Sequence, residues 1–169
     1  MESGFLQGDN EMIMHSIAPV YDENSKVLIL GSFPSVKSRE NQFFYGHPQN
    51  RFWRVISGVF EEETPKEIEE KKIFLVKNHI AVWDVIASCE IVGSSDATIT
   101  NVVPNNLTPI LECANIRQIF CNGAKSYELY CKYMEPKLGL AAKKLPSTSP
   151  ANAAWNLEKL VNAWRQIRT

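Results

Sequence analysis

The chain has 169 residues, the length of one domain with a full hydrophobic core. Hydrophobic residues make up 44% and charged residues 22%, as in an ordinary globular protein, and the apolar runs are too short to cross a membrane. The net charge of −1 excludes a strongly basic, general nucleic-acid binder, but the charge is uneven. Residues 1–112 hold 9 Lys and Arg against 16 Asp and Glu, whereas residues 113–169 hold 9 against 3, so a local phosphate-binding surface is expected in the second part.

The N-terminus and the cysteines indicate the compartment. The first ten residues lack the basic start and apolar core of a signal peptide, and residues 1–16 are expected to form a flexible extension ahead of a single domain over residues 17–169. The four cysteines and three histidines are scattered and include no C-x-x-C pair. We therefore expect a reduced, cytoplasmic chain, associated with the nucleoid if the source is prokaryotic, without disulfides, metal or cofactor.

Strand-like and helix-like segments alternate along the chain. Strands are predicted at residues 27–30, 80–83, 118–121 and 143–145. Helices are predicted at residues 52–60, 65–77, 107–113, 124–133 and 151–167. This order predicts an α/β fold, a three-layer α/β/α sandwich around a mostly parallel four-stranded sheet.

The segments that follow the strands carry the polar residues. In such sheets ligands bind beyond the carboxyl ends of the strands. The first strand ends in a Gly/Ser/Pro turn at residues 31–35, and an aromatic and amide-rich loop follows at residues 43–50. Rings for stacking beside amides and hydroxyls suit a flat heterocycle. The last strand leads into residues 146–152, whose prolines and serines form a stiff loop that can clamp a phosphodiester backbone.

Three ordered motifs carry a resemblance to a known family. They are GSFPSVKS with FFYGHPQNRFW at residues 31–38 and 43–53, VWDVIASCEIVGSSDATITN at residues 82–101, and LPSTSPAN at residues 145–152. With them, the chain resembles the uracil-DNA glycosylase superfamily over nearly its whole length. It is most similar to the hypoxanthine (deoxyinosine) DNA glycosylase branch, with the mismatch-specific uracil glycosylases as near relatives.

The resemblance implies a metal-free, monofunctional DNA glycosylase in base excision repair. Its partner is DNA containing deaminated bases: hypoxanthine first, then uracil or xanthine, with a monomeric enzyme expected. Phe33 occupies the slot where mismatch-specific relatives carry a polar Asn or Asp, so the resemblance assigns the catalytic role to Asn50. An amide can orient the attacking water by accepting its hydrogen bond, while backbone N–H groups or His47 stabilise the leaving base. No Lys lies where a Schiff-base nucleophile is needed, so strand cleavage is not expected.

Further site residues follow from the same motifs and from the strand ends. Base contacts are expected from Gly31, Ser32, Phe33, Pro34, Tyr45 and Asn122. DNA contacts are expected from Ser35, Lys37, Ser38, Lys143, Lys144, Pro146, Ser147, Thr148 and Ser149.

Several of these residues also have a purely structural interpretation. Asn50 can cap the helix that begins near Arg51, and Tyr45 can belong to the core. His47 can be an ordinary turn residue, and Asp96 can cap a short segment or contact substrate. The serines and threonine of residues 147–149 can cap the final helix.

Two other function classes remain open at this level. One is a module on the same fold that binds nucleic acid or a base without chemistry, which Phe33 in the polar slot keeps open. The other is a different hydrolase or transferase, which the absence of a G-x-S-x-G elbow and of a Gly-rich nucleotide loop disfavours.

Overall fold

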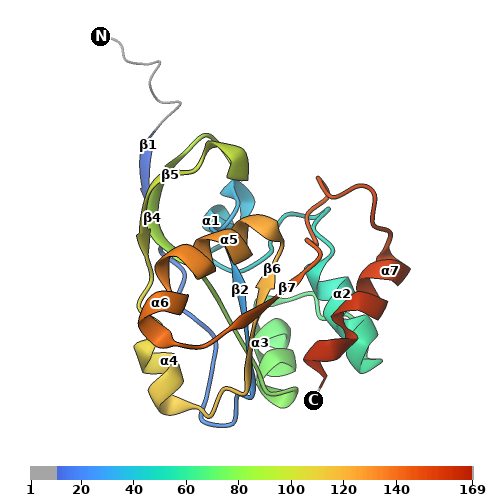
Figure 1. Ribbon diagram of the computed structural model, residues 1–169. Helices are drawn as coiled ribbons and strands as arrows, with labels where there is room; N and C mark the ends of the chain where they lie inside the picture. The colour runs from blue at the N-terminus through green and yellow to red at the C-terminus, as the bar shows by residue number, and fades with distance from the viewer. Residues whose placement is uncertain (1–10, 169) are drawn as a thin grey trace.

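A four-stranded parallel sheet forms the centre of the computed structural model, which describes residues 11–168 (Figure 1). The strands lie in the order β3 (Ile80–Asp84), β2 (Val27–Gly31), β6 (Gln118–Asn122) and β7 (Ala142–Leu145). All three pairings are parallel. Every residue of β2 is buried because the strand has a neighbour on each side and helices over both faces, which explains its unbroken apolar sequence. The predicted fold class is confirmed.

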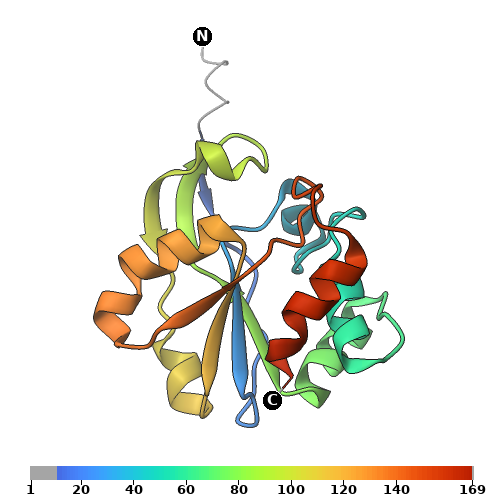
Figure 2. The same ribbon diagram turned by 45° about the vertical axis from the view of Figure 1, so that its right-hand side comes forward.

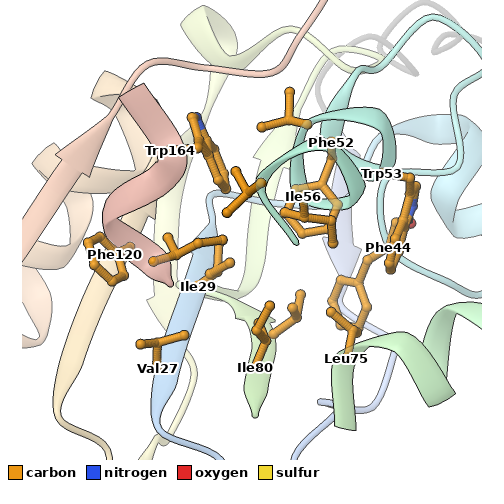
Figure 3. Packing of buried hydrophobic residues seen from close by; sticks show 14 of the residues in the cluster. Val27, Ile29, Phe44, Phe52, Trp53, Ile56, Leu75, Ile80, Phe120 and Trp164 are labelled. Carbon is orange, nitrogen blue, oxygen red and sulfur yellow. The ribbon is translucent and has the colours of Figure 1, made fainter. Parts of the chain in front are cut away.

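Helices cover both faces of this sheet (Figure 2). On one face lie α2 (Phe52–Phe60), α3 (Ile68–Lys77) and α7 (Leu157–Trp164). The other face carries α4 (Thr108–Cys113), α5 (Ala124–Tyr133) and the short α6 (Glu135–Leu138). Apolar residues recur at helical spacing in α2, and its buried side includes Phe52, Ile56 and Val59. Figure 3 shows this side packing toward β2 residues such as Ile29, with Trp164 of α7 beside it.

A second sheet, which the sequence analysis did not predict, lies beside the first. Its order is β1 (Glu11–Met14), β4 (Ile86–Ile91) and β5 (Thr100–Pro104), and both pairings are antiparallel. Strand β1 places residues 11–14 in the fold, earlier than the expected start at Ile17, because β4 offers it a free edge. The rest of the expected extension, residues 1–10, lies outside the described residues.

Two predicted helix starts are wrong, each for a capping reason. The final helix begins at Leu157 rather than residue 151, because Asn156 caps it by accepting a hydrogen bond from Lys159 N, and a 3-10 turn (Arg165–Ile167) ends it. Helix α3 begins at Ile68 rather than residue 65, because Glu67 and Glu70 form a capping box at its start. A short helix, α1 (Val36–Asn41), was not predicted, and a 3-10 turn (Asp96–Thr98) forms where the sequence left open a short segment capped by Asp96. Within the described residues, no helix is long and apolar enough to span a bilayer.

Candidate active site

The carboxyl ends of three neighbouring strands form the floor of a pocket of about 260 Å³. Gly31 of β2 lies opposite Asp84 of β3, and Asn122 ends β6 one step beyond the pair of Leu30 and Cys121. The loop after β7 lies beside the loops after β2 (Figure 2), so all three sequence motifs meet at this edge. Of the predicted site residues, the pocket wall contains Ser32, Phe33, Pro34, Ser35, Ser38, Tyr45, His47, Asn50, Asp96, Asn122, Ser147, Thr148 and Ser149.

Asn50 is held by two hydrogen bonds to a single atom. Its Oδ1 accepts from the backbone N–H of Phe52 at 2.9 Å and from the hydroxyl of Thr148 at 2.9 Å. The first bond is the capping interaction foreseen from the sequence, one residue before the N-cap Arg51. Since a backbone N–H can only donate, it identifies this atom as the oxygen. The Nδ2 group has no partner among the described residues, so Asn50 offers the pocket a donor rather than the expected acceptor.

Thr148 links the loop after β7 to the strand ends. Its hydroxyl accepts from Asn122 Nδ2 at 3.0 Å, and its backbone N–H donates to Asn122 Oδ1 at 3.1 Å. Thr148 is fully buried, so it is a structural link and not the surface contact for DNA that was expected. Asn122 uses both of its polar atoms on Thr148, so a second Nδ2 hydrogen is what it retains for a ligand.

Arg51 fixes the rest of this loop. Its guanidinium donates to the backbone oxygens of Trp155, Ser149 and Asn152, the last two at 2.9 and 3.1 Å. Trp164 of α7 adds a bond from its indole N–H to Pro146 O at 2.9 Å. The loop is therefore ordered by its own contacts before any DNA is present. Sequence analysis missed this role of Arg51, because its acceptors are backbone atoms about 100 residues away in sequence.

Tyr45 belongs to both the core and the pocket. One face of its ring stacks on Phe52 at a centroid distance of 4.0 Å, which leaves only the other face for a base. Its hydroxyl is buried without a partner among the described residues. Burial, and next the charge of Asp84, raise the pKa of the Tyr45 phenol, so it stays protonated and can donate at neutral pH.

Phe33 fills the slot that is polar in mismatch-specific relatives. It is 8% exposed, and its ring meets the edge of the His15 ring at 5.9 Å. Beside it, Ser32 donates to a carboxyl oxygen of Asp96 at 2.9 Å. Asp96 is the first residue of a 3-10 turn whose N-cap is Ser95, so it does not cap this segment as one interpretation expected, but it does lie on the pocket rim. Desolvation by the surrounding walls raises the pKa of its carboxyl group, although the residue keeps an accessible outer side.

The remaining predicted residues separate into structural and exposed ones. Ser35 caps α1 by accepting from Ser38 N, and Ser38 is buried, with its hydroxyl accepting from Gly46 N at 2.9 Å. Ser38 is thus a support for the aromatic loop rather than a DNA contact. Exposed His47 accepts a hydrogen bond from Gln49 N on Nδ1, so in the neutral ring Nε2 is the donor. Lys37 is exposed and pairs with Glu40 at 3.6 Å.

The two lysines of β7 take opposite faces of the strand. Both Lys143 and Lys144 are exposed, and neighbouring strand residues point to opposite sides. Lys144 borders a hollow next to the pocket that Trp155, Pro146 and Asp96 also line. Lys143 does not line it, so the structure separates two residues that were predicted to act together.

Sequence analysis missed two residues of this region. Asp84, which lines the pocket, was not among the predicted site residues, although its place directly after a predicted strand was a usable signal. His15, which contacts Asp84, fell in the expected extension, and nothing in the local sequence connects it with the pocket.

Comparison with known proteins agrees with this architecture. The sequence model of the Uracil DNA glycosylase superfamily matches residues 18–168. The chain belongs to this superfamily. A hypoxanthine DNA glycosylase of Methanosarcina acetivorans is 37% identical over 146 residues, 83% of this chain and 89% of that protein. A hypoxanthine DNA glycosylase of Methanosarcina barkeri is 32% identical over 152 residues, 88% of this chain and 93% of that one.

A solved structure shows the same superfamily fold. The solution NMR structure of a candidate uracil DNA glycosylase from Methanosarcina acetivorans has a TM-score of 0.77 and 31% identity, covering 94% of this chain and 100% of that one. The resemblance found in the motifs is therefore confirmed, and an unrelated hydrolase or transferase is excluded.

Proposed function

We propose that this superfamily member is a monofunctional DNA glycosylase that flips a deaminated base out of DNA and hydrolyses its N-glycosidic bond. Hypoxanthine is the first substrate, with uracil and xanthine as further candidates. The observation that carries the proposal is the convergence of all three motifs on one pocket, with Asn50 fixed in its wall. The two Methanosarcina relatives, both hypoxanthine DNA glycosylases, support the choice of base.

The chemistry requires a held water and a stabilised leaving base. As the C1′–N bond stretches, the sugar gains oxocarbenium character and the base gains negative charge. Asn50 Nδ2 is free to donate to the oxygen of the attacking water, because Oδ1 already has two donors. The loop after Gly31 and the Nε2 group of His47 are the donors proposed for the leaving base. We further propose that the enzyme acts on DNA in the cytoplasm as a monomer.

A duplex with a single deoxyinosine tests the activity. We expect release of hypoxanthine in excess chelator, with strand breakage only after alkali, because an amide-oriented water needs no metal and no Lys among residues 11–168 lines the pocket for a lyase step. The measurement is a gel of labelled product under single-turnover conditions. Binding of the duplex without excision of any deaminated base would favour the non-catalytic binding module instead. Loss of activity on chelation, restored by zinc, would contradict the metal-free reaction.

The structure gives the DNA-binding surface a matched pair of variants. Each phosphate contact adds about one unit to the slope of log affinity against log salt concentration. Lys144→Ala is expected to flatten this slope by about one unit, because Lys144 lines the hollow beside the pocket. Lys143→Ala, with equal charge change on the opposite face of β7, is the control and should alter the slope less. If the slope in both variants equals that of the wild type, the DNA path lies elsewhere.

A further inference from the structure

Asp84, which lines the pocket, belongs to a buried histidine–aspartate pair. His15 Nε2 and Asp84 Oδ2 are 2.8 Å apart, and the two side chains are only 2% and 5% exposed. His15 is on the segment after β1, far from Asp84 in sequence, and lies outside residues 18–168 that match the superfamily.

The hydrogen bonds define the charge of the pair. Nδ1 of His15 accepts from the backbone N–H of Ile17 at 3.2 Å, so in this arrangement the imidazole is neutral and its proton is on Nε2. Nε2 then donates to Oδ2 of Asp84, which turns the other carboxylate oxygen toward the pocket. Oδ1 has no hydrogen-bond partner among the described residues, although Asp84 as a whole is 3% exposed. Asp84 lines the pocket, so this oxygen can accept a hydrogen bond from a donor that enters the pocket, whether water or a ligand.

Tyr45 places a donor next to this acceptor. A Cβ atom added to Gly31 would lie 2.4 Å from Asp84 Oδ1 and 2.9 Å from the Tyr45 hydroxyl, so both atoms lie close to the Cα atom of Gly31 on the same side. The Tyr45 hydroxyl is itself buried without a partner among residues 11–168. The pocket floor thus presents an acceptor, Asp84 Oδ1, and a donor, the Tyr45 hydroxyl, and neither makes a hydrogen bond within residues 11–168.

This pattern matches one edge of a deaminated base. We propose that Asp84 Oδ1 accepts the ring N–H and the Tyr45 hydroxyl donates to the adjacent carbonyl of the flipped base, with His15 as the positioning residue that aims Asp84. Hypoxanthine presents N1–H beside O6, and uracil presents N3–H beside O4. Adenine and cytosine present the reverse pattern, a ring nitrogen lone pair beside an amino group. Their ring lone pair would face the Asp84 carboxylate, and neither atom would carry a proton for a hydrogen bond. Guanine and thymine carry the same edge, so their 2-amino and 5-methyl groups must be rejected by other walls.

The inference rests on the proposed glycosylase function and is tested with two substrates. These are matched duplexes with deoxyinosine or N1-methyldeoxyinosine, which keeps the carbonyl but lacks the ring N–H. The wild-type protein should excise deoxyinosine faster by about 10²-fold, the order expected when a charged partner loses its hydrogen bond. Tyr45→Phe should slow deoxyinosine excision about 10-fold and keep the preference between the two substrates.

Asp84→Asn is the sharpest variant because His15 controls how the new amide is oriented. The amide oxygen should accept the His15 proton, which turns the NH₂ group toward the base N–H. Deoxyinosine excision should then fall about 10²-fold while the fold keeps its buried hydrogen bond. Adding His15→Ala removes the donor that fixes this orientation, so the amide can turn its oxygen to the base. The double variant should recover about 10-fold over Asp84→Asn alone.

Two controls distinguish a loss of base positioning from a loss of fold stability: thermal unfolding of each variant, and a variant of a remote histidine. His79→Asn is the control, because His79 is exposed in a turn at the opposite end of the sheet, and it should match the wild type. If the wild type excises deoxyinosine but folded Asp84→Asn keeps its rate and preference, the assignment of Asp84 is wrong. If the double variant is no faster than Asp84→Asn, the positioning role of His15 is wrong. If the wild type excises neither base, the glycosylase function itself fails.

Discussion

Asn50→Ala is expected to slow single-turnover excision of hypoxanthine by about 10²–10³-fold, the usual cost of removing a preorganised donor from a reaction site. The reason is the free Nδ2 group, which the fixed Oδ1 atom holds in one direction. Binding of deoxyinosine duplex should weaken by less than about 10-fold, because the loop after β7 keeps its bonds to Arg51. The measurements are single-turnover rates and duplex affinity at one salt concentration.

Asn106→Ala is the matched control for the capping role of Asn50. Asn106 makes the same local bond at the start of α4, where its Oδ1 accepts from Thr108 N at 3.1 Å, and it does not line the pocket. Both variants should lower the free energy of unfolding by about 0.5–2 kcal/mol, the cost of losing a cap. The control should excise hypoxanthine at the wild-type rate. An Asn50→Ala protein that is equally active would reduce Asn50 to a helix cap.

Gly31→Ala is expected to distort the pocket floor and lower excision by at least about 10²-fold, because it displaces both groups that we propose hold the base edge. Its Cβ atom would overlap with Asp84 Oδ1 at 2.4 Å and crowd the Tyr45 hydroxyl at 2.9 Å. Asp84 cannot move aside cheaply, because His15 holds its other oxygen. The strain should also lower the free energy of unfolding by about 1–3 kcal/mol, as for other overpacked sites.

Gly46→Ala provides the comparison for Gly31→Ala. A Cβ atom at Gly46 would come within 3.2 Å of the end of the Asn41 side chain, which can rotate away. This variant should keep a wild-type melting temperature within a few degrees and its excision rate. Gly31→Ala with wild-type excision would show that Asp84 and Tyr45 do not hold the base edge.

The main sheet could be predicted from local sequence because buried parallel strands are short apolar runs. Val27–Leu30 and Gln118–Cys121 are such runs, and each lies within an observed strand. The second sheet was missed because β5 pairs only at one edge, and its residues are mostly exposed and mixed in character. Strand β1 has even less local signal, since its place depends on the edge that β4 presents.

The sequence by itself determined which residue types the site would have and at which end of the sheet they would lie. Gly31, Asn50 and the Pro/Ser loop are recognisable because strand ends and motifs are local patterns. Only the tertiary structure decided how these groups face one another. Asn50 became a donor because Thr148 and the Phe52 N–H occupy its oxygen, and Asp84 became part of the floor because His15 takes one of its two oxygens. The Phe52 bond is local, but the bonds from Thr148 and His15 come from partners distant in sequence, which no local pattern could specify.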